Sequence, residues 1–133
     1  MKRLGLALLI SILGLLPAKA DEGAVRDVIA SQIDAFSRDD FAAAFDHASP
    51  LIQHMFRTPQ RFGQMVQTGY PMVWRPAGVR FGLYENREGR IYQYVAFEDT
   101  AGRSYLTEYE MIELDTGWKI NGVRMLPDAS FGA

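Results

Sequence analysis

The sequence of 133 residues contains no cysteine. This absence excludes disulfide bonds, thiolate metal sites, thiol catalysis and a lipid-modified N-terminal cysteine. A domain of this length without cross-links has to be stabilised by ordinary apolar packing.

An excess of positive charge is missing as well, since 14 lysines and arginines stand against 16 aspartates and glutamates. Nucleic-acid-binding domains carry a basic patch or stripe, so we expect no nucleic-acid partner. The sequence has neither a glycine-rich phosphate loop nor a Gly-x-Ser-x-Gly nucleophile motif. His47 and His54, even with Asp46 beside them, lack a fourth ligand at metal-site spacing, so we expect no metal and no cofactor.

Long apolar runs are absent except at the N-terminus. Lys2 and Arg3 precede an apolar run over residues 4–16, Pro17 ends it, and Ala18-Lys19-Ala20 has the small residues that a signal peptidase requires. The run is shorter than the ~20 apolar residues that span a bilayer. The pattern is therefore typical of a secretory signal peptide.

The predicted domain organisation follows from that pattern. We expect residues 1–20 to be a signal peptide and residues 21–133 to form a single domain with one core. The protein would then be periplasmic or secreted, with no membrane span after cleavage.

Helical spacing dominates the first half of the chain. Apolar residues recur every three or four positions over residues 24–36 and again over 41–48, and Pro50 ends the second stretch. Residues 51–56 predict a further short helix. Thr58-Pro59 is a cap followed by proline at the first helical position, which predicts another helix over residues 60–68.

After Pro76 the apolar residues alternate, which is typical of strands. The four predicted strands cover residues 79–86, 90–98, 104–114 and 118–126, and each intervening turn contains glycine. The predicted fold class is α+β, with N-terminal helices packed on one face of a curved four-stranded antiparallel sheet.

A register with loops of three, four and three residues keeps apolar positions opposite one another. It pairs Val79 with Phe97, Phe81 with Val95, Val95 with Leu106, Gln93 with Glu108, Glu108 with Arg124, Ile112 with Ile120 and Leu114 with Trp118. On this register one end of the helix-covered face is polar and carries Gln93, Glu108, Glu110 and Arg124.

The opposite face of the predicted sheet collects mainly tyrosines and methionines, namely Tyr84, Tyr92, Tyr94, Tyr105, Tyr109, Met111, Val123 and Met125. Such residues are enriched at interfaces, so this Tyr-rich face predicts a possible homodimer.

Several segments resemble a known family. WKINGV, over residues 118–123, resembles the closing strand of the cone-shaped superfamily named after nuclear transport factor two. IDAF, DDFAAAFDHASPLIQHMF, FGQMV and GYPMVWRP are similar to segments of an uncharacterised family of exported bacterial proteins in that superfamily, a domain of unknown function. The resemblance implies the cone fold and no activity. The Tyr, Asp and His arrangements of the superfamily's enzymes, such as ketosteroid isomerase and scytalone dehydratase, have no counterpart here.

The candidate ligand-binding residues are polar or large side chains expected at the mouth of the cone. They are Trp74, Arg75, Gln93, Glu108, Glu110 and Arg124. Ionised groups on a core face have to be paired or stand at a wet cavity, so a structural Glu108–Arg124 ion pair is the alternative. For the loop, the alternative is that Trp74 fills the core and Arg75 caps a helix or holds a carboxylate.

Three functions remain open from the sequence. The first is an exported module for assembly or for binding a small apolar or anionic ligand. The second is a proton-transfer enzyme of the isomerase or dehydratase type, with an inward Glu108 or Glu110 as base. The third is an interaction or dimerisation module whose cone is filled by side chains. A cavity of ~300 Å³ or more with Glu and Arg in its wall would favour the first two, and a filled cone would contradict both.

Overall fold

The computed structural model describes residues 18–127, while residues 1–17 and 128–133 lie outside the described part of the chain. Most of the predicted signal peptide therefore falls outside it, and the predicted cleavage point after Ala20 lies in the first turn of the first helix. Within the described part, no helix is both long and apolar enough to cross a membrane.

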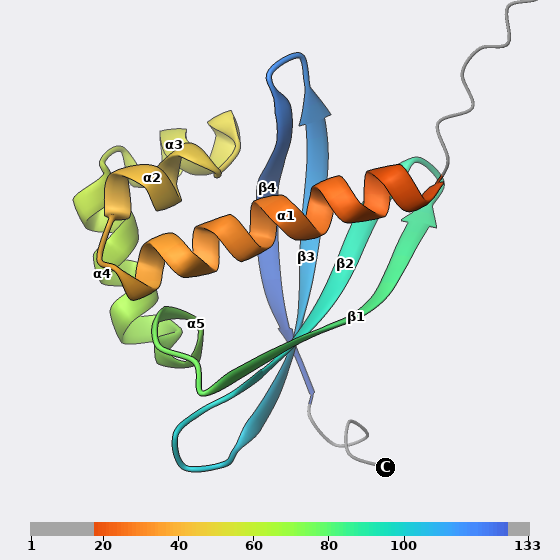
Figure 1. The fold of residues 1–133 in the computed structure, drawn as a ribbon. Coiled ribbons are helices and arrows are strands. Elements are labelled where there is room, and N and C mark those ends of the chain that lie inside the picture. Colours follow the sequence, from red (N-terminus) through yellow and green to blue (C-terminus); the bar gives the residue numbers. More distant parts are fainter. Residues whose placement is uncertain (1–17, 128–133) are drawn as a thin grey trace, which may run out of the picture.

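Helices are followed by a meander of strands, as the sequence predicts (Figure 1). The helices are α1 (Ala18–Ser37), α2 (Phe41–Asp46), α3 (Pro50–Phe56), α4 (Pro59–Gly69) and α5 (Pro71–Trp74). The strands are β1 (Gly78–Arg87), β2 (Arg90–Glu98), β3 (Ser104–Leu114) and β4 (Gly117–Leu126). All neighbouring strands pair antiparallel in the order β1-β2-β3-β4, which confirms the α+β class.

Local caps explain where the short helices begin. The side chain of Asp40 accepts a hydrogen bond from the Ala43 amide at the start of α2. Ser49 and Thr58 cap α3 and α4 in the same way, and each is followed by proline at the first helical position. These caps fix the points at which the chain turns around the end of the sheet.

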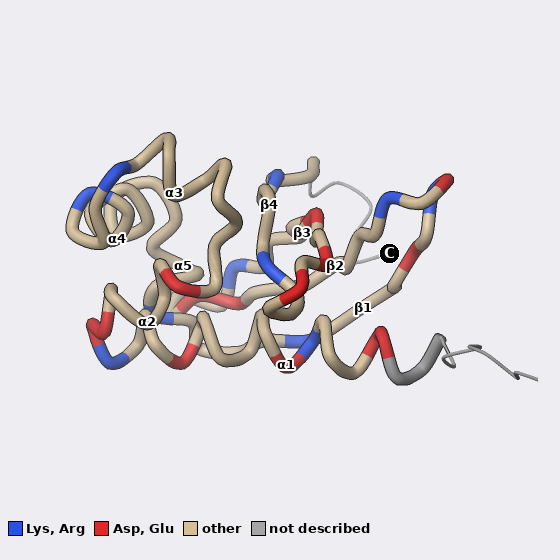
Figure 2. Tube along the Cα trace, turned by 90° about the horizontal axis from the view of Figure 1, so that it is seen from above, with Lys and Arg blue, Asp and Glu red and all other residues tan. Residues whose placement is uncertain are grey.

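The core lies between α1 and one face of the sheet. Val25, Ile29, Ile33 and Phe36 recur at helical spacing on α1 and are buried, as are Val95, Phe97, Met111 and Ile120 on the strands. Seen from above, α1 runs along one face of the sheet and no labelled helix runs along the other (Figure 2). We call the covered side the inner face and the opposite side the outer face.

An aromatic cluster holds the short helices to the end of α1. The ring of Phe62 on α4 lies 5.7 Å from Phe36, 5.3 Å from Phe45 and 5.6 Å from Phe56, measured between ring centroids. Aromatic pairs at this spacing stabilise a core beyond their buried area. The cluster fixes α1, α2, α3 and α4 relative to one another.

The predicted register is correct in part. Val79 pairs with Phe97, Phe81 with Val95 and Glu108 with Arg124, as expected. The pairing of β2 with β3 is wrong by one residue, because Val95 lies opposite Thr107 and Gln93 opposite Tyr109. Near the last turn, Ile120 pairs with Met111 and Trp118 with Glu113, instead of with Ile112 and Leu114.

A slip of one residue exchanges the two faces of a strand. The inner positions of β3 are therefore Tyr105, Thr107, Tyr109 and Met111, and the outer positions are Leu106, Glu108, Glu110 and Ile112. On β4 a bulge at Asn121 keeps Trp118 and Ile120 inward, as predicted, and turns Arg124 outward.

The predicted Tyr-rich outer face is also wrong in most of its members. Tyr84, Tyr105, Tyr109, Met111 and Val123 pack with the core under the helices. Tyr92 and Tyr94 remain on the outer face, and Met125 is exposed. The physical reason is that the only carboxylate of this phase of β3 is Glu113, which lies exposed near the last turn, whereas the other phase would place both Glu108 and Glu110 under the helices.

Candidate functional site

A cavity of about 270 Å³ lies inside the domain, between the helices and the β3–β4 part of the sheet. Its volume is close to the lower end of small-molecule sites, which begin near ~300 Å³. Its walls come from every helix except α2, together with β3 and β4. The lining residues are Gln32, Phe36, Ala48, Ile52, Met55, Phe56, Phe62, Met65, Val66, Tyr70, Val73, Tyr109, Ile120, Gly122 and Val123.

Within residues 18–127, the wall of this cavity is apolar and carries no charged side chain. Aliphatic, methionine and aromatic groups form most of it, and the polar side chains are those of Gln32, Tyr70 and Tyr109. The described residues thus supply no carboxylate or imidazole to act as a strong base and no cation to bind an anion. The arrangement is suited to enclosing an apolar molecule with one or two polar contacts.

Tyr109 is the most deeply buried of these polar groups. Its residue is 1% exposed, and it lies on β3 between Gln93 of β2 and Val123 of β4. No other residue of the described chain forms a hydrogen bond with the Tyr109 hydroxyl, and burial raises the pKa of this phenol far above its usual range. The hydroxyl therefore stays protonated and has an unused capacity to donate and to accept.

Gln32 is the second buried polar group of the cavity wall. It is 3% exposed, and its Nε2 donates to the Ala44 carbonyl over 3.0 Å, which ties α1 to α2. Because a carbonyl only accepts, this bond fixes the orientation of the amide. The Oε1 atom then faces elsewhere, and no donor from residues 18–127 reaches it.

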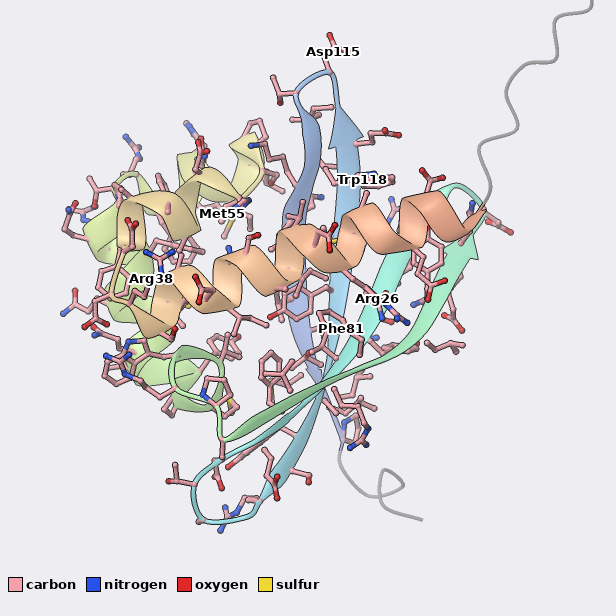
Figure 3. All side chains as sticks on the ribbon, in the orientation of Figure 1. Arg26, Arg38, Met55, Phe81, Asp115 and Trp118 are labelled. Atoms are coloured by element: carbon pink, nitrogen blue, oxygen red, sulfur yellow. The ribbon has the colours of Figure 1, made fainter. Side chains whose placement is uncertain are left out.

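The α3 helix forms one wall of the cavity and has no buried residue. It is attached to β4 at its start, where the Ser49 amide donates to the Ile120 carbonyl over 2.8 Å and the Ser49 hydroxyl donates to Asn121 over 2.7 Å. Met55 lines the cavity although it is 59% exposed, so it lies where the cavity opens to solvent (Figure 3).

Gln93 lies on the inner face, as predicted, but outside the cavity wall. Its Nε2 lies 3.0, 3.2 and 2.9 Å from the carbonyl oxygens of Gly82, Leu83 and Tyr94, so its two N–H groups are shared among three acceptors. Its Oε1 accepts from Arg26 over 3.3 Å, and the Arg26 guanidinium lies over the Phe81 ring (Figure 3). The amide thus satisfies the backbone at the β1 irregularity between Phe81 and Tyr84, and both of its N–H groups are used within the protein.

Glu108 and Arg124 are cross-strand partners, as predicted, but they lie on the outer face. The 5%-exposed Glu108 carboxylate accepts from Arg124 Nε and Nη2 over 3.1 and 2.9 Å and also from Arg87. Arg87 stacks on Tyr92 with 3.7 Å between the guanidinium and the ring centroid. Burial raises the pKa of Glu108, but the hydrogen bonds from Arg87 and Arg124 outweigh it and hold this pKa below its usual value.

Glu110 completes this outer group. Its carboxylate accepts from the Asn121 amide over 3.4 Å, and it lines a shallow hollow of about 320 Å³ together with Glu108 and Arg124. The expectation of an inward polar end formed by these three residues is wrong, because the one-residue slip of β3 places them outside. The alternative of a structural ion pair describes Glu108 and Arg124 well.

Trp74 and Arg75 lie at the end of α5, where their side chains contact the turn between α1 and α2, and neither lines the cavity. Trp74 Nε1 donates to Asp39 Oδ1 over 2.9 Å, and Arg75 Nη2 contacts both Asp39 oxygens at 3.1 Å. Arg75 also donates to the Ser37 carbonyl at the end of α1. These contacts hold Asp39, whose φ is 56°, and they match the second interpretation of Arg75 as a helix cap and carboxylate partner.

The two histidines belong to no metal site among the described residues. Burial and the nearby Lys119 charge lower the pKa of His47, so this imidazole is neutral near neutral pH. Within residues 18–127, no group of three or more His, Asp and Glu side chains is arranged to hold a metal ion.

Sequence reasoning missed the residues that do line the cavity. The predicted register places Tyr109 on the outer face, and no sequence pattern singles out Gln32, Met55 or Met65. The available signal was that the phase of β3 with Tyr109 carries one carboxylate, Glu113 near the end of the strand, whereas the other phase carries Glu108 and Glu110 in its middle. Nothing in the sequence indicates that the surrounding side chains leave an open volume.

Comparison with known proteins gives a family and a fold. A model of the family described as Domain of unknown function (DUF4864) matches residues 18–133. No curated protein matches the chain. The solved structure of Aln2 from a Streptomyces species is similar with a TM-score of 0.50 and 12% identity, over 89% of this chain and 98% of that chain. At this identity the likeness shows the fold alone, and it supports the expected cone of the nuclear-transport-factor-two type.

Proposed function

The chain belongs to the family described as Domain of unknown function (DUF4864), and we propose that it binds a small, mostly apolar molecule in the cavity between its helices and its sheet. The observation that carries this proposal is an open volume of about 270 Å³ inside an otherwise packed core. Well-packed interiors leave few voids larger than a water molecule. An apolar void of this size loses dispersion contacts and transfer free energy that a ligand would restore.

The proton-transfer alternative is not favoured. It needed Glu108 or Glu110 inside the cone, and both carboxylates lie on the outer face. In the described part of the chain, no carboxylate or imidazole lines the cavity. The filled-cone alternative is not favoured either, because the side chains leave a cavity of about 270 Å³ between the helices and the sheet.

An anionic ligand is a poor match to this cavity. Arg75 and Arg124, the two cations expected to hold an anion, are engaged with Asp39 and Glu108. An ionised ligand would have to lose its hydration in an apolar enclosure without a counter-charge, which is very costly. The proposed ligand is therefore uncharged.

We further propose that the protein acts after export, in the periplasm or outside the cell, because residues 1–20 have the pattern of a signal peptide. Native mass spectrometry of protein recovered from the exported fraction tests both proposals. The chain mass should correspond to a start at Asp21, and a titration with naphthalene as an apolar probe should add one probe mass per chain.

A matched pair of variants locates the binding. Met65→Trp places a larger side chain in the cavity wall, whereas Met125→Trp makes the same change at an exposed position of β4 outside it. We expect Met65→Trp to abolish probe binding and Met125→Trp to leave it unchanged. Equal probe binding by both variants, or none by the parent protein, would contradict the cavity as the binding site.

A further inference from the structure

We infer that the ligand is a neutral molecule with one hydroxyl group, which accepts a hydrogen bond from the Tyr109 phenol and donates one to Gln32 Oε1 inside the cavity. This inference rests on the proposed function and names the class of ligand. Two buried polar atoms with unused hydrogen-bonding capacity carry it.

The first atom is the Tyr109 hydroxyl. Buried tyrosines usually place this group against a partner, because a buried polar group without a hydrogen bond is costly. Tyr109 is 1% exposed and lines the cavity, and its hydroxyl has no partner in the described chain. A ligand oxygen in the cavity would supply that partner.

The second atom is Gln32 Oε1 on α1. The Gln32 residue is 3% exposed and lines the same cavity, and its amide is oriented by the bond from Nε2 to the Ala44 carbonyl. The oxygen is an acceptor, so it requires a donor from the ligand.

A hydroxyl group answers both requirements. It has one donor hydrogen and two acceptor lone pairs, whereas a ketone or ether oxygen only accepts. A hydrocarbon would leave both protein atoms unpartnered. The body of the ligand is expected to be apolar and planar or compact, because phenylalanine and methionine side chains form much of the remaining wall.

The charge of the ligand is restricted by the same wall. None of the lining residues is ionisable near neutral pH. Because burial raises the pKa of Tyr109, its phenol stays a neutral donor and provides no negative charge for a cationic ligand.

A set of three aromatic probes of the same shape tests the inference by ligand-observed NMR titration. The probes are naphthol, naphthalene and naphthoate, which differ by a hydroxyl, no polar group and a carboxylate. We expect naphthol to bind about tenfold more tightly than naphthalene, the gain expected for hydrogen bonds to otherwise unpartnered buried groups. Naphthoate should bind at least about 100-fold more weakly than naphthol, because its charge would be desolvated.

Tyr109→Phe removes only the hydroxyl, and Tyr94→Phe is the matched control on the outer face of β2. We expect Tyr109→Phe to reduce the preference for naphthol over naphthalene by about fivefold with little change in naphthalene affinity. Tyr94→Phe should leave all three affinities unchanged. Circular dichroism spectra of both variants verify that they are folded.

The outcomes separate this inference from the proposed function. If naphthalene binds and Met65→Trp blocks it, while naphthol has no advantage or keeps it in Tyr109→Phe, the cavity binds ligands but the hydroxyl assignment is wrong. Tight binding of naphthoate at the cavity would likewise overturn the neutral class. If no probe binds to the folded parent protein, the proposed function itself fails.

Discussion

Two neighbouring residues of β3, Glu108 and Tyr109, are both buried and both polar, but they face opposite sides of the sheet and differ in how they are satisfied. On the outer face, the Glu108 carboxylate is held by Arg87 and Arg124. On the inner face, the Tyr109 hydroxyl has no partner in the described chain. The charged group thus has its hydrogen-bond partners within the protein, whereas the neutral hydroxyl has none among the described residues.

The difference shows which kind of polar residue indicates a binding site. A buried charge without partners costs so much that the fold has to supply them, whereas one unpartnered neutral hydroxyl costs only about 1–3 kcal/mol. A stable domain therefore tolerates an unpartnered neutral hydroxyl but not an unpartnered buried charge. In this protein the conspicuous charges are structural, and the inconspicuous phenol is the better indication of a ligand.

The largest expected effect tests the assignment of faces itself. Met111 is 2% exposed on the inner face of β3, and its neighbour Ile112 is half-buried on the outer face. Met111→Ala should lower the free energy of unfolding by about 2–5 kcal/mol, because it leaves a core cavity. Ile112→Ala, the matched control, should cost less than about 1.5 kcal/mol. Urea unfolding of both variants measures the difference.

The opposite ranking is the outcome that the sequence-based register predicts. If Ile112→Ala proved more damaging than Met111→Ala, Glu108 would face the helices and Tyr109 would face solvent. The comparison between the two residues would then be reversed.

The helices were predictable because their signals are local. Asp40, Ser49 and Thr58 each bond to an amide three residues ahead, and prolines follow the last two caps. The strands were predictable as well, but their register was predictable only in part, because it depends on loop geometry.

The loop between β2 and β3 explains the slip. The predicted register assumes four loop residues, whereas Glu98 pairs with Ser104 and leaves five between them. Asp99 organises this loop, since its carboxylate accepts from the amides of Ala101 and Arg103 over 2.9 Å each. The bulge at Asn121 then restores the inward direction of Trp118 and Ile120, so the prediction for β4 is correct near the last turn although that for β3 is wrong.

The candidate site was less predictable than the fold for a different reason. Which residues are apolar is visible in the sequence, but an open volume depends on how side chains from α1, α3, α4 and the sheet fail to fill the space between them. No local pattern encodes that mismatch. The charged residues were conspicuous in the sequence, but the structure pairs them with one another.

The second prediction tests how much the ion pairs of Glu108 with Arg87 and Arg124, on the outer face, stabilise the folded protein. Glu108→Gln should lower the free energy of unfolding at neutral pH by about 1–3 kcal/mol, between the values for buried and exposed pairs, because the two arginines are partly exposed. Glu113→Gln, at an exposed position of the same strand, is the control and should change little. Chemical denaturation at neutral pH measures both.

The contribution of Glu108 to the free energy of unfolding should depend on pH, and the direction of its pKa shift fixes the direction of that dependence. The pKa of Glu108 is lowered in the folded protein, so its contribution is present above the unfolded pKa, near 4.5, and is lost as the pH falls through the folded value. The difference between parent and Glu108→Gln should therefore shrink as the pH falls below about 4.5. A constant difference down to pH ~2 would mean that Glu108 stabilises through packing and not through its charge.

The smallest effect has the opposite direction and concerns the unpartnered phenol. In the ligand-free protein, Tyr109→Phe should raise the free energy of unfolding by about 1 kcal/mol, because it removes a desolvated hydroxyl and keeps the ring in place. Tyr105→Phe is the control, since the Tyr105 hydroxyl donates to Asp99 over 2.9 Å and its loss should be neutral or destabilising. In the presence of saturating naphthol this advantage should disappear, because the roughly fivefold tighter binding expected for the parent corresponds to about 1 kcal/mol of additional stabilisation. Thermal unfolding with and without naphthol measures both differences. A ligand-free Tyr109→Phe variant that is less stable than the parent would show that the hydroxyl is already satisfied within the protein, and the contrast with Glu108 would disappear.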